Sequence, residues 1–323
     1  IRQALLQLLL KREWSLGAVL LLTTAAVWTV NPAFLAPGNL VDMLVNAAPI
    51  VIIACGVTLV IVSGEIDISV GSMMGFLGAC LGLMTSTVHG NWPVWAAVPA
   101  TVLLGGLLGC VNGLLVTRVG VPSIIVTLGM LTILRGATEV VMGGEWITDL
   151  PDGLRTIGTG GVAGLPYSVW TGAAIVLLAI FLTRRTAAGR RIYAVGSQPH
   201  AAELCGLSLT RTRLFAFTVT GLLTGVATVI SVPQLSVVES GIGVGLELLV
   251  VTCVVVGGTS IRGGIGTITG TVLGVLLLSM IRTVLIFLRL GETATYWERT
   301  VQGGFILAAV LLDHLAQNRR SSP

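Results

Sequence analysis

The sequence TRRTAAGRRIYAVGSQPHAAELCGLSLTRTR, residues 183–213, is the only long polar stretch in an otherwise apolar chain. It holds six arginines and one acidic residue, Glu203, and apolar runs flank it at 168–182 and 214–232. Short loops this rich in arginine stay on the cytoplasmic side of a membrane. The stretch therefore predicts a cytoplasmic loop between two membrane spans, and it orients the rest of the chain.

A short helix is predicted inside this loop, over 199–206. Proline is favoured in the first turn of a helix, and glycine is a typical C-terminal stop. The helix would expose small or apolar side chains to water, which favours a partner that covers them. One interpretation is a solvated loop with an incidental turn. The other is a docking helix for a cytoplasmic protein, with the candidate docking residues Pro199, Ala201, Ala202, Glu203, Leu204 and Gly206.

Composition excludes a soluble domain. Hydrophobic residues make up 54% of the 323 residues, charged residues 10%, and the mean hydropathy is +0.97. The net charge of +4 comes from loop arginines that orient the chain, so no nucleic-acid partner is expected. The five cysteines form no CxxC pair and have no histidine at ligand spacing, so neither disulfides nor a metal site is expected. These numbers predict that the chain is surrounded by membrane lipid.

Ten apolar segments predict an all-α polytopic membrane protein with about ten spans, some of them broken, in a single domain over 1–323. An even count places both termini on the same side. If that side is the cytoplasm, most basic residues lie inside, which supports this topology. The first segment follows Lys11 and Arg12 as a signal peptide would, but no small-residue cleavage site follows, so it is interpreted as a retained span. The segments are 14–30, 41–62, 68–84, 92–116, 123–142, 168–182, 214–232, 246–258, 266–288 and 300–312.

The loop 143–167, GGEWITDLPDGLRTIGTGGVAGLPY, is predicted to be external. It carries Glu145, Asp149 and Asp152 among turn-forming prolines and glycines. The loop is either a solvated connection or an acidic docking surface for a partner outside the cytoplasm.

A weak internal repeat is predicted to mark the solute path. Residues 62–75 resemble 256–270, and each copy is an apolar run, a polar glycine-containing break and a glycine-rich apolar run. Paired, glycine-interrupted segments point to the substrate path of a transporter. The predicted topology makes the repeat parallel; one span more or fewer would make it inverted. The candidate path residues are Glu65, Asp67, Ser69, Ser72, Thr259 and Ser260.

Two further patterns are interpreted as structural. Glycine recurs at every fourth position in two segments, which lets helix backbones approach closely in lipid. Arg135 and Glu139 lie one turn apart inside a span, where they would neutralise each other. The glycines are Gly105, Gly109 and Gly113 in one segment and Gly266, Gly270 and Gly274 in the other.

Catalytic chemistry is not indicated. Lys11 is the only lysine, and no GxxxxGK[ST] motif precedes it, so the chain has no Walker A loop for nucleotide phosphates. The three histidines lie far apart, and no nucleophile is paired with a base. We therefore expect no catalytic residue, no metal and no cofactor bound by this chain, and energy for transport would have to come from another protein.

Four blocks resemble the membrane permease subunit of bacterial ABC importers for monosaccharides, the branch that takes ribose, xylose, arabinose, rhamnose and autoinducer-2. The blocks are SGEIDISVGS at 63–72, PSIIVTLGMLTILRG at 122–136, GRRIYAVGSQPHAAELCGLSLTRTR at 189–213 and VVGGTSIRGGIGTITGTVLG at 255–274. The resemblance implies a dimer of identical or homologous permease chains, two cytoplasmic ABC ATPase subunits that hold the ATP, and a periplasmic or extracellular sugar-binding protein. It also implies that the helix near 199–206 couples to the ATPase, and that the chain lies in the bacterial inner membrane.

We therefore expect the transmembrane subunit of an ATP-driven importer, which forms the translocation path for a small sugar or sugar-like solute. The alternative is a secondary transporter that works alone and is driven by ions or protons. Such coupling needs carboxylates deep inside the bundle of membrane spans, and Glu139 is the only carboxylate that the sequence clearly places there.

Overall fold

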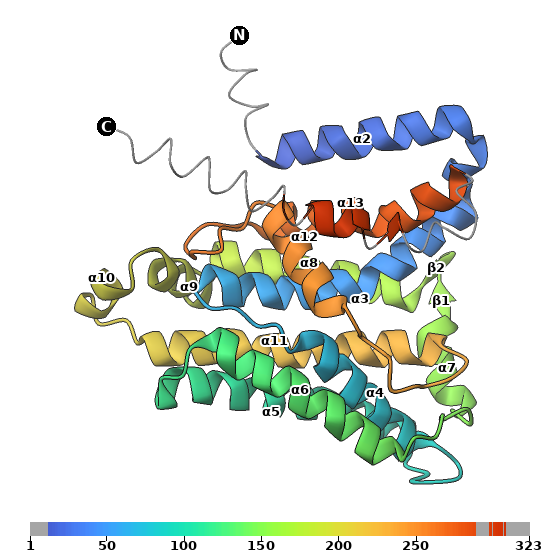
Figure 1. Ribbon diagram of the computed structural model, residues 1–323, viewed down its shortest axis with the longest axis horizontal. Coiled ribbons are helices and arrows are strands. Elements are labelled where there is room, and N and C mark those ends of the chain that lie inside the picture. The colour runs from blue at the N-terminus through green and yellow to red at the C-terminus, as the bar shows by residue number, and fades with distance from the viewer. Residues whose placement is uncertain (1–11, 289–296, 299, 306, 308–323) are drawn as a thin grey trace.

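Seven helices among the residues that the computed structural model describes, 12–288, 297–298, 300–305 and 307, are long and apolar enough to cross a membrane. They lie roughly along one common direction (Figure 1). Each coincides with a predicted apolar segment. They are α2 (Arg12–Val30), α3 (Pro37–Val62), α5 (Val94–Leu114), α6 (Ser123–Met142), α8 (Tyr167–Arg185), α11 (Leu209–Ser231) and α13 (Ile268–Phe287). The prediction of an all-α polytopic protein is confirmed.

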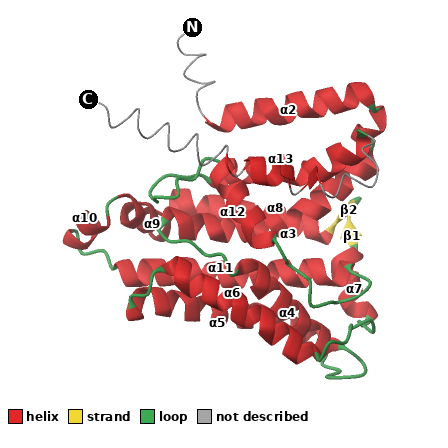
Figure 2. Ribbon diagram, in the orientation of Figure 1, coloured by secondary structure: helices red, strands yellow, loops and turns green. Residues whose placement is uncertain are grey.

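Two predicted spans are short helices that cannot cross a membrane alone. These are α4 (Val70–Thr85) and α12 (Leu246–Val256), with 16 and 11 residues. At 1.5 Å per residue they are about 24 and 16 Å long, against about 30 Å for the hydrocarbon core. Each follows a non-helical segment that runs back into the bundle (Figure 2). Of the tenth predicted span, 300–312, residues 300–305 are helical, and 306 and 308–312 lie outside the described residues.

The two interrupted segments run in opposite directions. α3 and α11 pack side by side, with Gly56 against Thr220 and Gly64 near Arg213, so the end of one helix meets the start of the other. Residues 63–69 lead from α3 into α4, and residues 232–245, which begin with the 3₁₀ helix η3 (Val232–Gln234), lead from α11 into α12. The segments 63–69 and 232–245, which we call the first and second breaks, are thus inverted relative to each other. The predicted break at 257–266 is also non-helical, and it lies at the same end as 63–69, because the Gly264 N–H donates to the Val62 carbonyl and Gly263 packs on Gly64. The two copies of the predicted repeat, 62–75 and 256–270, therefore run in the same direction, as predicted.

A glycine stripe on α4 lets the second break enter the bundle. A side chain at Gly71 would strike Glu247 and the Gly243 carbonyl, and one at Gly75 would come within 2.7 Å of the Ile242 carbonyl oxygen. Small residues at this spacing allow backbone to pack directly on a helix. The starts of α4 and α12 are therefore held against each other.

The predicted glycine stripe on α5 packs against α11. Any side chain at Gly109 would overlap the Phe217 carbonyl, and a side chain at Gly113 would come within 2.8 Å of Leu214. In α13, Gly270 lies against Gly257, the residue after α12, and Gly274 lies against Cys253 of α12 in the same way. The interpretation of both stripes as packing surfaces is confirmed.

Arg135 does not pair with Glu139 as predicted. Its Nη1 donates to the carbonyl oxygens of Ser240 and Ile242, at 3.3 and 2.8 Å. Glu139 is exposed. The arginine therefore satisfies backbone carbonyls of the re-entrant segment, which have no helix or sheet partner at that point.

The two predicted loops lie at opposite ends of the bundle (Figure 1). One end carries α9 (Ala187–Ser197) and α10 (Pro199–Leu204); the other carries α7 (Asp152–Thr159) and the hairpin β1 (Gly161–Val162) and β2 (Leu165–Pro166). The π-helix η2 (Leu115–Val119) extends α5, and the 3₁₀ helix η1 (Pro32–Leu35) joins α2 to α3. Nothing in this arrangement conflicts with the predicted topology, in which these ends are cytoplasmic and external.

Asp149 ties the loop before α7 to the turn after α4. The Ser86 hydroxyl donates to its Oδ2 at 2.7 Å, and the Val88 N–H and the Thr87 hydroxyl donate at 3.1 Å. The Ser86 bond, helped by those from Val88 and Thr87, lowers the pKa of Asp149 to about 2. Asp149 therefore orders the loop, whereas Glu145 and Asp152 remain exposed.

Candidate functional site: the α9–α10 end and the start of α4

The predicted short helix is present as α10. It begins at Pro199, and it ends in a turn where the N–H groups of Gly206 and Leu207 donate to the carbonyls of Glu203 and Ala202. Gly206 adopts φ = 77°, which glycine tolerates and other residues rarely do. The predicted start and stop are therefore correct.

The predicted exposed face of α10 needs one correction. Ala202 is 5% exposed, because its side chain points toward the rest of the bundle end, so it cannot belong to a surface that waits for a partner. Leu204 is 78% exposed, and Pro199, Ala201, Glu203 and Gly206 are also exposed. On a helix of this length, one side must pack on the protein that carries it, and sequence alone did not reveal which side.

The α9–α10 end of the bundle is closed by direct backbone contact between three segments. The Gly264 N–H donates to the Val62 carbonyl at 2.8 Å, and Gly196, next to the end of α9, leaves no space for a side chain against that same carbonyl. Gly263 packs on Gly64 in the same manner. We call this contact of 62–64, 196–197 and 263–264 the glycine closure.

Tyr193 fixes α9 against the α12–α13 turn beside the glycine closure. Its hydroxyl donates to the Gly266 carbonyl at 2.8 Å. Burial raises the pKa of Tyr193, so the phenol keeps the proton that it donates. Any shift of α9 therefore strains both this bond and the glycine closure.

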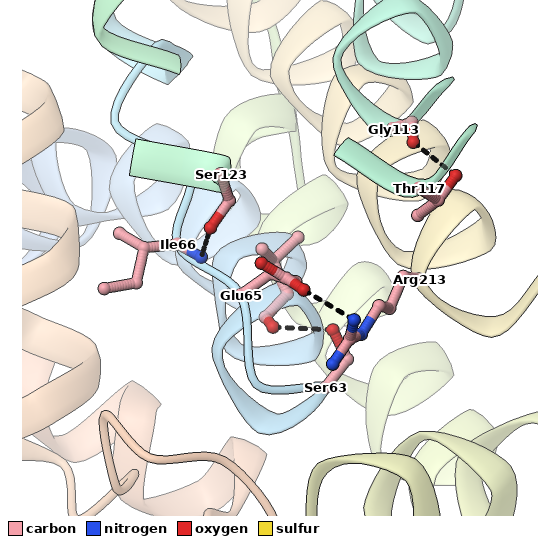
Figure 3. A network of polar contacts seen from close by, with 8 residues as sticks. Ser63, Glu65, Ile66, Gly113, Thr117, Ser123 and Arg213 are labelled. Carbon is pink, nitrogen blue, oxygen red and sulfur yellow. Dashed lines mark hydrogen bonds and ion pairs between the residues drawn. The ribbon is translucent and has the colours of Figure 1, made fainter. Parts of the chain in front are cut away.

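A cavity of about 420 Å³ lies beside the closure and contains the only ion pair that joins α11 to the first break among the described residues. Arg213 Nη1 lies 2.9 Å from Glu65 Oε1. Figure 3 shows the two side chains pointing toward each other. Glu203 of α10 and Thr117 also line the cavity. The predicted path residue Glu65 and the α10 residue Glu203 thus face one cavity.

Asp67, Ser69 and Ser72 are fully buried at the start of α4. Asp67 Oδ1 accepts from the Ser69 N–H at 2.9 Å and from the Ser69 hydroxyl at 2.7 Å. Asn112 on α5 donates from Nδ2 to Ser69 Oγ at 2.9 Å. The Ser72 hydroxyl donates to the Ser69 carbonyl at 2.8 Å. These contacts fix where the helix begins.

The remaining two path residues lie elsewhere. Thr259 is fully buried against Gly266, and Ser260 is 8% exposed in the turn between α12 and α13. No hydrogen bond recorded in the described part of the chain joins them to Asp67 or Ser69. The six predicted path residues therefore form two separate groups, one at the start of α4 and one near the glycine closure, and their contact with solute stays a prediction.

Sequence reasoning missed Asn112, Arg213 as the partner of Glu65, and Gly196. Asn112 is a lone amide in an apolar helix, which is itself a signal of a buried polar contact. Arg213 was counted only as one of the loop arginines. Gly196 carries no sequence signal of its own, because its contacts come from segments distant in the chain.

The arrangement is that of a polytopic transport protein. The family model "Branched-chain amino acid transport system / permease component" matches residues 39–310. The chain belongs to this permease family. The matched region contains both breaks of the permease, its α10 and its glycine closure.

Curated relatives cover the permease almost end to end. It is 35% identical to the "Ribose import permease protein RbsC" of Haemophilus influenzae over 91% of each chain. It is 32% identical to the "L-arabinose ABC transporter permease protein AraH" of Azospirillum brasilense, over 94% of the permease and 87% of that relative. It is 34% identical to the "Autoinducer 2 import system permease protein LsrC" of Klebsiella pneumoniae, over 95% and 87%.

Proposed function

We propose that this permease is the transmembrane subunit of an ATP-driven importer for monosaccharides or similar polyhydroxylated solutes. The observation that carries the proposal is the near full-length similarity to permeases named for ribose, L-arabinose and autoinducer 2 import. The permease is a transport subunit and not an enzyme. Its sequence has no Walker A motif, so ATP would be bound and hydrolysed by another chain.

Its partners follow from the same proposal. A cytoplasmic ABC ATPase would bind the exposed side of α10, a solute-binding protein would dock at the α7 end, and a second permease chain would complete the path. The protein would lie in the bacterial inner membrane with both termini in the cytoplasm. The arginine-rich stretch supports this orientation, because it lies at the α10 end.

The glycine closure supplies a route from the ATPase to the solute path. α10 follows α9 directly, and Gly196 near the end of α9 touches the Val62 carbonyl and Gly264. A movement of α10 would therefore pull on the three segments that close the bundle end. The ion pair of Glu65 and Arg213 would separate in the same movement, because Arg213 lies in the second turn of α11, just beyond α10.

Reconstitution tests the proposal. The permease should be purified with its co-purifying proteins, placed in liposomes with a binding protein, and supplied with ATP and labelled D-ribose, L-arabinose, L-rhamnose or autoinducer 2. We expect ATP-dependent accumulation of at least one of these solutes. Accumulation by the permease alone under an ion or proton gradient, without ATP, would establish the secondary-transporter alternative instead.

Variants of α10 test its coupling role. Leu204→Asp changes an exposed side chain, so the permease should fold and insert normally while solute-stimulated ATPase activity falls. Ala202→Arg is a contrasting variant, because Ala202 is buried in the permease itself and the charge should destabilise the free chain. Normal transport by Leu204→Asp would remove α10 from the ATPase contact.

A further inference from the structure

The buried contacts of Asp67 leave two acceptor atoms unmatched. Asp67 Oδ1 accepts both bonds from Ser69, while Oδ2 has no partner. The Oδ1 atom of Asn112 also has none. Both side chains are fully buried, and both bind the Ser69 hydroxyl, so they are neighbours. Two neighbouring acceptors without a donor are costly at this depth.

The orientation of the Asn112 amide is fixed by its neighbours. The Ser69 hydroxyl uses its proton toward Asp67 Oδ1, so its oxygen can only accept. Asn112 must therefore present Nδ2 to Ser69 Oγ, as the 2.9 Å contact has it. The carbonyl oxygen of Asn112 therefore points away from the Ser69 hydroxyl and can accept a hydrogen bond from another donor.

We propose that Asp67 is a neutral carboxylic acid, and that its Oδ2 proton is donated to the Asn112 carbonyl oxygen to lock the start of α4 to α5. One proton then satisfies both unmatched acceptors. The chain of bonds becomes closed: Asp67 to Asn112, Asn112 to Ser69, and Ser69 back to Asp67. Asp67 is thereby a positioning residue that holds the half-helix α4 in place, and not a charged ligand for solute.

No ion pair or hydrogen bond joins Asp67 to a positive charge in the described part of the chain. The helices packed against α4 carry Arg135 and Glu139 on α6, Arg211 and Arg213 on α11, and Glu247 on α12; of these, Glu139 and Arg211 are exposed. Arg135 binds backbone carbonyls, Arg213 binds Glu65, and Glu247 accepts from a backbone N–H. The α4 dipole alone favours an anion at its start, but it returns much less free energy than the burial of an unpaired carboxylate costs.

Infrared spectroscopy of the purified full-length permease tests the protonation state directly. We expect the C=O stretch of a protonated, hydrogen-bonded carboxyl in the wild type at neutral pH, absent from Asp67→Asn and shifted in Asn112→Leu. This measurement needs neither a solute nor an ATPase, so its outcome is independent of the proposed function. Wild-type and Asp67→Asn spectra that do not differ in this band at neutral pH would overturn the proposal.

Transport by the assembled complex provides the second test. Asparagine has the shape of a protonated aspartate and keeps one donor, so Asp67→Asn should retain uptake within about twofold of wild type, whereas Asp67→Ala should lose about tenfold. Asp42→Asn, at an exposed position of α3, is the matched control. Uptake that falls as far in Asp67→Asn as in Asp67→Ala would show that the charge itself is required, as in a solute or cation ligand.

Discussion

The substitution Gly196→Ala should open the glycine closure. Gly196 has helical backbone in α9, so alanine is tolerated by φ and ψ and should even gain about 0.5–1 kcal/mol from helix propensity. The new methyl group, however, would overlap the Val62 carbonyl and come within 2.8 Å of Gly264 N. Both contacts are with backbone, which cannot rotate away, so α9 must withdraw by about 1 Å.

The energetic cost follows from these contacts. Overpacking against backbone costs about 1–3 kcal/mol. Separation of the Gly264 N–H from the Val62 carbonyl leaves two polar groups unpaired, at about 1–3 kcal/mol. After the propensity gain, the free energy of unfolding should fall by about 2–4 kcal/mol. Gly129→Ala in α6 is the matched control, because nothing lies within 4 Å of the added methyl group.

Two assays separate opening of the closure from general damage. The thermal unfolding midpoint in detergent should fall for Gly196→Ala and stay or rise for Gly129→Ala. A Thr259→Cys probe, buried beside the closure, should react faster with an impermeant thiol reagent in inside-out vesicles when Gly196→Ala is also present. Equal midpoints and equal labelling rates in the two backgrounds would refute the reasoning that Gly196 holds this end shut.

Three further outcomes are expected. Because the pKa of Asp149 is lowered, its hydrogen bond with Ser86 should stabilise the outer loop fully above about pH 4, and this stabilisation should be lost as the pH falls toward 2. Hydrogen exchange of the backbone amides of residues 143–150, followed against pH, measures this loss. The variant Asp149→Asn should abolish the pH dependence. Arg135→Gln should free the Ile242 carbonyl and cost about 1–3 kcal/mol of stability, seen as faster labelling of a cysteine introduced in 240–242; unchanged labelling would contradict it. Gly109→Ala should lower the unfolding midpoint, since its methyl group meets the Phe217 carbonyl; an unchanged midpoint would mean that α5 and α11 separate freely.

The sequence alone determined the class, the seven long helices and the family. Apolar length, arginine distribution and glycine spacing are local properties, because the bilayer requires each span to satisfy its own backbone. The same holds for α10, whose start at Pro199 and stop at Gly206 depend on their own backbone preferences.

Only the tertiary structure revealed the break at 232–245 and the side of α10 that is exposed. The sequence match between 62–75 and 256–270 located two non-helical segments that meet at the glycine closure. The break at 232–245, which enters along a glycine stripe on α4, has no counterpart in that match. Ala202 and Leu204 are both apolar, and their burial differs because one faces the bundle. The partners of Ser69 and Glu65, which are Asn112 and Arg213, lie 43 and 148 positions away in the chain. Contacts between distant segments leave no periodic trace in a single sequence, whereas the membrane imposes its pattern on every span separately.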